Sequence, residues 1–183
     1  MVNSTPLIYL ARAGALRLLW GLYGGVVAPR AVYVEVVERS LEKGFRDAEA
    51  VKAAVEEGYI RVEEADEGLA AGILERAPML HRGEAEAIAL ALSVGQCHLI
   101  VDDRAARNVA EAMGLEVHGT LYVLAASAAR GLLQAGEALA ILDRLVMSDF
   151  RISVELYLRV KELLLRLAAE KNPGRGALRE SRK

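Results

Sequence analysis

The chain has 183 residues, a length that suits a single domain. Its net charge of −2 gives no overall attraction to nucleic acids, so any RNA binding must come from local arginines or from a bound cation. Hydrophobic residues make up 54% and aromatic residues 5%, which favours a Leu, Val, Ile and Ala core in an α/β or all-α fold over a β-sandwich or barrel. The single cysteine excludes disulfides within the chain and thiolate metal sites. The lack of a long apolar run argues against a membrane span, so we expect a cytoplasmic protein.

The first half of the chain alternates short strands with helices. The expected elements are a strand at 1–3, a helix with Ser4 and Thr5 as its cap and Pro6 in its first turn, a second helix at 15–22, a glycine turn, a strand at 26–28, a helix from Pro29 through Glu35, a helix at 46–57 and an edge strand at 59–65. A loop-rich stretch then runs to about Arg82.

The second half shows a more regular alternation. The expected elements are helices at 83–94, 104–113 and 120–130, strands at 97–103 and 115–119, and two amphipathic helices at 137–148 and 153–170. Such alternation is typical of crossover units around a parallel sheet. We expect a domain at 1–147, a helical extension packed on it at 148–170, and a basic, disordered tail at 171–183. The apolar faces of 137–168 suit three roles: closing the core, forming a dimer interface or receiving a partner helix.

Three segments carry carboxylates where an α/β domain favours apolar residues: Glu35, Glu84 and the pair Asp102-Asp103. Valines flank Glu35, Glu84 opens an almost wholly apolar helix, and the two aspartates end a strand of buried type. Ligands of parallel sheets bind at the carboxyl ends of strands, and buried carboxylates need a compensating charge. A cluster of ionised acids therefore predicts a cation that prefers oxygen ligands, and with it a metal-dependent hydrolase.

Each acid also has a structural interpretation. Glu84 and Glu86 lie in a first helical turn, where the helix dipole favours acids, although Glu84 heads the apolar stripe and Glu86 lies about 200° away around the helix. Asp102 or Asp103 would cap the next helix, but capping needs only one acid. Among the glutamates of its helix, Glu35 alone looks partly enclosed.

The order of these residues resembles that of the PIN-domain nucleases, and in particular their DUF3368-type branch. Four segments carry the resemblance: VNSTPLIYLARAGALRLL, VVAPRAVYVEVVE, HRGEAEAIALAL and LIVDDRAARNVAEAMGLEVHGTLYVLAASAARGLL. It extends to about residue 165, and GEAEAIALAL together with DDRAAR is its most specific part. The resemblance implies an α/β fold, a three-layer α/β/α sandwich with a mostly parallel sheet, plus C-terminal helices.

The resemblance also implies a metal-binding role for the positions of the family's acids and one neighbour: Asn3, Glu35, Glu84, Asp102 and Asp103. The catalytic residues among them are Glu35, Glu84 and Asp103, and the accessory residues are Ser4, Thr5 and Glu86. It further implies one or two Mg²⁺ or Mn²⁺ ions and hydrolysis of phosphodiester bonds in single-stranded RNA. Members of this kind act as toxins of toxin–antitoxin pairs, form homodimers and are inhibited by a small antitoxin protein.

One position departs from the family. Asn3 stands where the family has an aspartate, which removes a negative charge and weakens Mg²⁺ binding, although an amide oxygen still coordinates. The alternative function is therefore a catalytically impaired PIN-like scaffold that binds RNA or protein. Candidates for contacts with the RNA backbone are Arg12, Arg82, Arg104 and Arg107. The histidines at 81, 98 and 118 are too far apart in the sequence for a local zinc motif, which leaves only convergence in space.

Overall fold

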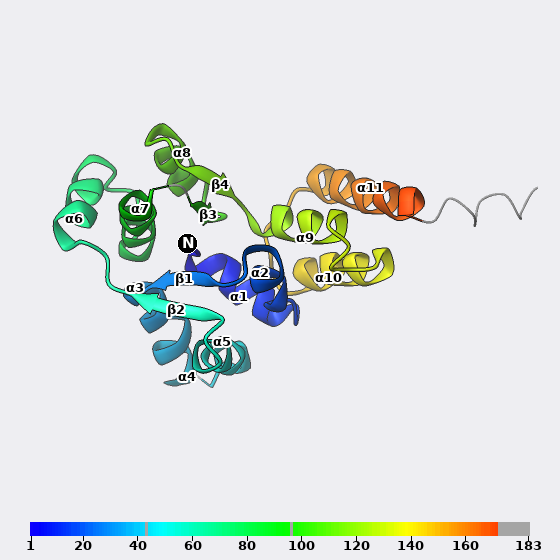
Figure 1. Ribbon diagram of the computed structural model, residues 1–183, viewed down its shortest axis with the longest axis horizontal. Coiled ribbons are helices and arrows are strands. Elements are labelled where there is room, and N and C mark those ends of the chain that lie inside the picture. Colours follow the sequence, from blue (N-terminus) through cyan, green and yellow to red (C-terminus); the bar gives the residue numbers. More distant parts are fainter. Residues whose placement is uncertain (43, 96, 172–183) are drawn as a thin grey trace, which may run out of the picture.

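The computed structural model describes residues 1–42, 44–95 and 97–171 and shows a mixed α/β protein that is mostly helical (Figure 1). Its elements are α1 (Ser4–Arg12), α2 (Arg17–Tyr23), β1 (Val26–Pro29), α3 (Arg30–Tyr33), the π-helical turn η1 (Val34–Glu38), α4 (Arg39–Glu42), α5 (Arg46–Glu56), β2 (Ile60–Glu63), α6 (Glu67–Arg76), α7 (Arg82–Val94), β3 (His98–Ile100), α8 (Arg104–Ala112), β4 (Glu116–His118), α9 (Thr120–Ala129), α10 (Ala135–Met147) and α11 (Val154–Lys171).

The strands of the described residues are parallel, as predicted, and form two small sheets. β1 pairs with β2, and β3 pairs with β4. The start of the chain lies between the two sheets, because the Val2 N–H donates to the Val27 carbonyl at 2.9 Å and Val2 forms a parallel bridge with Ile100. Figure 1 shows the N-terminus between β1 and β3.

The predicted three-layer sandwich around one wide sheet is therefore present only in part. The strands are three or four residues long, and α1 begins at Ser4, directly after the bridge at Val2. The segment at 1–3 consequently joins the two sheets through a few hydrogen bonds and is too short to be a full strand between them. Parallel pairing and alternation were readable from the sequence, whereas the width of the sheet was not.

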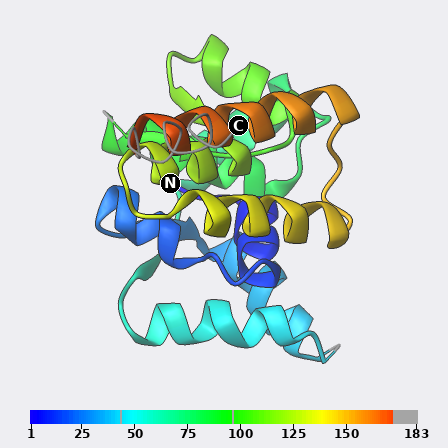
Figure 2. The same cartoon turned by 90° about the vertical axis from the view of Figure 1, so that its right-hand side faces the viewer.

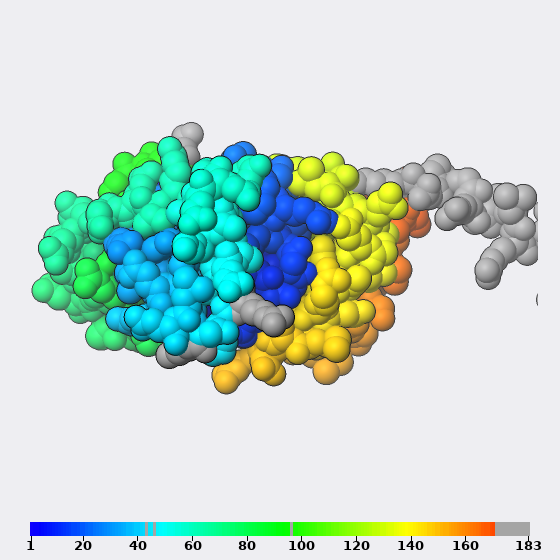
Figure 3. Space-filling model, turned by 90° about the horizontal axis from the view of Figure 1, so that it is seen from below, coloured from blue at the N-terminus to red at the C-terminus, as the bar shows by residue number. Residues whose placement is uncertain are grey.

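Two hydrophobic clusters support this framework. The larger one packs α1, α2 and β1 against α9, α10 and α11, and the smaller one packs α6 and α7 against β3 and α8. Figure 2 shows α9, α10 and α11 layered at one end of the molecule, and Figure 3 shows the dark blue N-terminal residues between the cyan and yellow segments. Glu84 and Asp103 belong to elements of the smaller cluster, and Asn3 and Glu35 to elements of the larger one.

The C-terminal helix packs on the rest of the protein through its buried side chains. Val160 and Leu164 of α11 belong to the larger cluster, and α11 contacts α9 and α10. Of the tail expected at 171–183, residues 172–183 lie outside the described residues, so that expectation stays a prediction. No helix in the described part of the chain is both long and apolar enough to cross a bilayer.

Helix α6 occupies a stretch that the sequence predicted as loop. The Asp66 carboxylate accepts a hydrogen bond from the Leu69 N–H at 2.7 Å and caps the helix, and Ile73 on its inner face is fully buried. The prediction was wrong because Gly68 and Gly72 lower helix propensity, and propensity is a weak guide where a cap and a buried face act together.

Candidate functional site

Residues from four separate segments gather near the carboxyl ends of β1 and β3. Asn3 follows the bridge at Val2, Glu35 lies in the helical segment after β1, Glu84 lies in the first turn of α7, and Asp103 follows β3. Asn3 and Glu84 are 3% and 9% exposed, whereas Glu35 and Asp103 are exposed. The site thus combines two buried side chains that carry oxygen ligand atoms with two such side chains that are exposed to solvent.

A direct contact joins the start of α1 to the π-helical turn. The Ser4 hydroxyl donates to the Glu35 carboxylate, with 2.6 Å between Oγ and Oε2. Ser4 is free to do so because Asn3, and not Ser4, occupies the N-cap position of α1. Of the two expected accessory hydroxyls, Ser4 therefore contacts Glu35, while Thr5 lines a cleft together with Asp103.

Gly83 lets the first turn of α7 approach these residues. A Cβ atom added at Gly83 would lie 3.7 Å from Asn3 Oδ1 and 3.8 Å from Glu35 Oε2, and only 3.1 Å from Val32. Asn3, Glu35 and the residue before Glu84 are thus close neighbours, although more than thirty residues separate each from the next along the chain.

Glu35 is exposed as a whole residue, contrary to the expectation that it is partly enclosed. Its neighbours Val36 and Val37 take the buried positions instead, and only the end of the Glu35 side chain is held, by Ser4. The helix register changes here because residues 34–38 form a π-helical turn, a local irregularity that is frequent at functional sites.

Glu84 is held in place and is surrounded by like charges. Its Oε2 atom accepts a hydrogen bond from the His81 backbone N–H at 2.8 Å. Burial raises the pKa of Glu84 above its usual value, and repulsion from Asp103 and Glu35 adds to that rise, while the His81 hydrogen bond opposes it. Glu84 therefore lies near enough to both Asp103 and Glu35 to interact with each of them electrostatically.

We expect the Glu84→Gln variant to be more stable than the wild type at pH 7, by about 2–4 °C in Tm, because it removes a buried charge and keeps an oxygen for the His81 N–H. A raised pKa means that protonation stabilises the wild type, so the gain should shrink as the pH falls through the raised pKa and disappear below about 4.5. Thermal unfolding in EDTA at several pH values measures this. The exposed Glu57→Gln serves as control, and a pH-independent gain would contradict the assignment.

The two aspartates after β3 have different partners. Asp103 caps α8, with Oδ1 accepting the Ala106 N–H at 2.9 Å. Asp102 uses both oxygens, one for the Thr120 N–H at 2.8 Å and one for the Thr120 hydroxyl at 2.6 Å. Burial raises the pKa of Asp102, and the hydrogen bonds from Thr120 and the charge of Arg107 oppose that rise. Asp102 therefore fastens the end of β3 to α9, and Asp103 keeps its second oxygen without a hydrogen-bond partner among the described residues.

We expect Asp102→Ala to lower stability by about 2 kcal/mol, or about 5 °C in Tm, because it leaves the N–H and the hydroxyl of the buried Thr120 without their acceptor. Urea unfolding of Asp102→Ala, Thr120→Val and the double variant measures the coupling between the two residues. The losses should be clearly less than additive. A fully stable Asp102→Ala variant that loses Mn²⁺ affinity would instead make Asp102 a candidate metal ligand.

Glu86, expected as an accessory residue, is buried and uses both carboxylate oxygens in hydrogen bonds within the protein. It is 6% exposed, its Oε1 atom accepts from Arg82 at 2.6 Å, and its Oε2 atom accepts from the Ala31 N–H at 3.1 Å. The bond to Ala31 ties α7 to the start of α3 and the bond to Arg82 lies within α7, so Glu86 supports the position of Glu84 without offering a free oxygen.

Each of the three proposed catalytic carboxylates has one oxygen that accepts a hydrogen bond from the protein. The three carboxylates are also not close enough together to bind one metal ion as they stand. Among the described residues, Glu35, Glu84 and Asp103 do not form a group whose ligand atoms all lie within 4.8 Å of one another. Like charges repel, and Ser4, the His81 N–H and the Ala106 N–H each hold one of the carboxylates apart from the others. A single metal ion bound by all three therefore requires these carboxylates to move closer together.

Two clefts open beside these residues. One of about 550 Å³ includes Glu35 and Gly83 in its wall, and another of about 730 Å³ includes Thr5 and Asp103. Arginines line both: Arg30, Arg39 and Arg82 in the first, and Arg104, Arg107 and Arg151 in the second. The predicted candidate Arg12 lines neither cleft and pairs with Asp47 at 3.2 Å.

Sequence reasoning missed Gly83 and Thr120. Gly83 stands directly before the acidic pair of α7, where a small residue signals close approach of another segment. Thr120 is the first residue of α9 after β4, and a hydroxyl at such a junction is a common partner for an acid at the end of the neighbouring strand.

Comparison with known proteins identifies the family of this chain. The family model DUF3368, described as a PIN domain, matches residues 1–166. No match was found among curated proteins or among solved structures. The match covers all four segments that contribute Asn3, Glu35, Glu84 and Asp103, and PIN domains are a family of nucleases that typically bind a divalent metal. The chain therefore belongs to the DUF3368 family of PIN domains.

Proposed function

We propose that this protein is a Mg²⁺- or Mn²⁺-dependent endoribonuclease that hydrolyses single-stranded RNA. The observation that carries the proposal is the meeting of distant residues around Gly83, where Asn3 and Glu35 flank α7 and Ser4 holds Glu35. The contribution of Asp103 and Glu35 to the raised pKa of Glu84 supports the inclusion of all three acids in one site.

The donor set fits a metal ion that prefers oxygen. Asn3 offers an amide oxygen, and Glu35, Glu84 and Asp103 offer carboxylates, which are the ligands that Mg²⁺ and Mn²⁺ take in proteins. Such an ion supplies an activated water and neutralises charge that develops on the phosphate. Ser4 and the His81 N–H fix one oxygen each of Glu35 and Glu84, so the second oxygens are left to bind.

The two clefts offer groups that bind a single-stranded nucleic acid. The second cleft combines Arg104, Arg107 and Arg151 with the aromatic rings of Tyr9 and the exposed Tyr122. Arginines contact phosphates, and aromatic faces stack on unpaired bases, so this combination suits a single strand. Arg39, Arg104 and Arg151 form no ion pair with a described residue, and their charges are available to phosphates.

Incubation of the purified protein with a fluorescent single-stranded RNA, with and without Mn²⁺, tests the proposal. We expect cleavage only with the metal, slower cleavage of the same RNA in a duplex, and products with a 5′-phosphate. An Asp103→Asn preparation purified in parallel controls for contaminating nucleases, and equal cleavage by both preparations would refute the proposal.

An impaired scaffold is the second candidate, because Asn3 carries no charge and the three carboxylates do not share one point. This candidate predicts RNA binding without cleavage. Electrophoretic mobility shifts with the same RNA in Mn²⁺, together with absence of products, would select it over the nuclease.

We further propose that the nuclease acts as the toxin of a toxin–antitoxin pair and associates with a small antitoxin and a second copy of itself. Supporting this, α11 buries Val160 and Leu164 but exposes a second set of apolar side chains: Leu156, Leu158, Leu163 and Leu165. Exposed apolar surface of this kind is typical of interaction sites. Expression of the chain alone should arrest growth, and co-expression with the product of a short neighbouring reading frame should restore it.

A further inference from the structure

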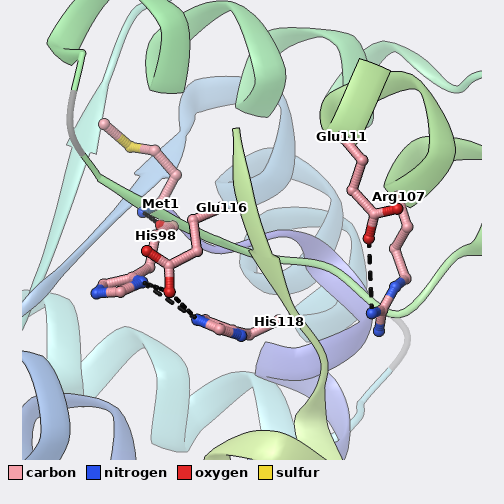
Figure 4. Close-up of polar contacts among 6 residues, drawn as sticks. All are labelled: Met1, His98, Arg107, Glu111, Glu116 and His118. Carbon is pink, nitrogen blue, oxygen red and sulfur yellow. Dashed lines mark hydrogen bonds and ion pairs between the residues drawn. The ribbon is translucent and has the colours of Figure 1, made fainter. Parts of the chain in front are cut away.

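A cluster of two histidines and a glutamate lies on the β3–β4 pair and shares no residue with the acids described above, although His118 lines the same cleft as Asp103. His98 is the first residue of β3 and pairs with Glu116 of β4, and His118 follows two residues later on β4. Side chains two residues apart on a strand point to the same face, and paired residues share that face. The register of the sheet therefore directs all three side chains to one side, where Figure 4 shows them pointing toward a common point.

The three ligand atoms form a nearly equilateral triangle. His118 Nε2 lies 3.2 Å from His98 Nδ1 and 3.1 Å from Glu116 Oε1, and His98 Nδ1 lies 3.3 Å from Glu116 Oε1. In a tetrahedral zinc site with metal–ligand distances of ~2.0–2.1 Å, neighbouring ligand atoms are ~3.3–3.4 Å apart. The triangle thus has the spacing that three of the four ligands require.

We propose that His98, Glu116 and His118 form a zinc-binding site, separate from the proposed nuclease site. Two imidazole nitrogens and one carboxylate oxygen are ligands typical of Zn²⁺, whereas Mg²⁺ prefers oxygen alone. A set of three protein ligands leaves the fourth position of the ion for water or another ligand. The lone pairs of the two imidazole nitrogens and of the carboxylate oxygen can all bind one cation. A single proton held between two of these atoms would leave the third without a partner.

The surroundings support metal binding. The Tyr122 ring stacks on His118 with centroids 3.7 Å apart, and the Tyr23 ring lies 5.3 Å from the His98 ring, so both imidazoles are held in orientation. The side chains of His98 and Glu116 are 42% and 62% exposed, and both line a cleft of about 740 Å³, which gives an ion access.

Tyr23 adds an independent sign of a missing contact. Among the described residues, its hydroxyl is the only buried side-chain polar atom without a hydrogen-bond partner. This hydroxyl therefore needs an acceptor that the described residues do not supply, such as a bound water.

The test uses a Glu84→Gln/Asp103→Asn background, so that the acids of the proposed nuclease site do not contribute. We expect titration with Co²⁺, followed by the visible absorption of a tetrahedral complex, to show one site per chain, and Zn²⁺ to displace the Co²⁺. His98→Gln or His118→Gln should weaken Zn²⁺ binding at least about 100-fold, and saturating Zn²⁺ should raise the Tm of the background protein by about 5–10 °C.

The matched control is Glu111→Gln, a neighbouring exposed glutamate that pairs with Arg107 and that Figure 4 shows apart from the cluster. It should bind Zn²⁺ like the background protein. Glu116 is largely exposed, so Glu116→Ala removes a ligand without disturbing the core and keeps the test valid if a histidine variant fails to fold. The zinc site would be overturned if the background protein did not bind Zn²⁺. It would also be overturned if Glu116→Ala and the folded histidine variants kept the Zn²⁺ affinity of the background protein. Either result would leave the nuclease proposal unaffected.

Discussion

Replacing Glu84 by glutamine should lower kcat/KM for RNA cleavage by about 1000-fold, which corresponds to roughly 4 kcal/mol of lost transition-state stabilisation. Glutamine keeps the size of the side chain and still accepts the His81 N–H, so the fold of α7 is preserved. The charge that faces Asp103 and Glu35 is lost, and with it a ligand of the proposed ion. Single-turnover cleavage of a labelled RNA in saturating Mn²⁺ measures the effect, and Asp103→Asn should show a loss of similar size.

The matched control is Glu86→Gln, an equally buried glutamate two residues along the same helix. The Glu86 oxygens accept hydrogen bonds from Arg82 and the Ala31 N–H, so Glu86→Gln should lower stability. At temperatures where this variant is folded, its kcat/KM should stay within about threefold of the wild-type value. Equal losses of activity at 84 and 86 would show that the substitutions act through the packing of α7, and would remove Glu84 from the reaction.

Converting Asn3 to aspartate should raise the affinity for Mn²⁺ by about tenfold, or about 1.4 kcal/mol, because it adds a charge beside Glu35 and Gly83. The same change should destabilise the metal-free protein at neutral pH, since Asn3 is 3% exposed and a new charge there meets other acids. Isothermal titration with Mn²⁺ and thermal unfolding with and without Mn²⁺ measure the two opposite effects.

The exposed Asn108 on α8 offers a control with the same chemistry. Asn108→Asp should change neither the Mn²⁺ affinity nor the stability beyond the small effect of a surface charge. If Asn3→Asp binds Mn²⁺ no better than the wild type, Asn3 is not a ligand, and the departure from the family's aspartate has another cause.

Much of the local structure was predictable because it depends on neighbouring residues. Gly95 and Gly114 follow the ends of α7 and α8 with positive φ angles, as expected of helix-ending glycines, and the strand at His98–Ile100 lies within the predicted apolar run. The exception was α6, where the capping of Asp66 and the burial of Ile73 decided the outcome against two glycines. The burial of Ile73 is not visible without its packing partner, whereas the cap at Asp66 is a local signal that the two glycines outweighed.

For the candidate site, the sequence identified the residue types but not their partners. It could not tell Asp102 from Asp103, since both follow the same strand, and the structure separates them through the bonds of Asp102 to Thr120, eighteen residues away. It also could not show that Glu86 is fully used by Arg82 and α3. Such contacts depend on which segments meet, and residue order does not specify that.

The amino-acid sequence by itself determined the alternation of helices and strands, the parallel pairing and the family, because hydrophobic period, caps and motif order are local properties. The tertiary structure alone decided that the segment at 1–3 joins two small sheets, that Ser4 holds Glu35, and that His98 meets His118. These contacts join residues 20 or more positions apart, and their geometry follows from strand register and helix packing, which are set only when the whole chain has folded.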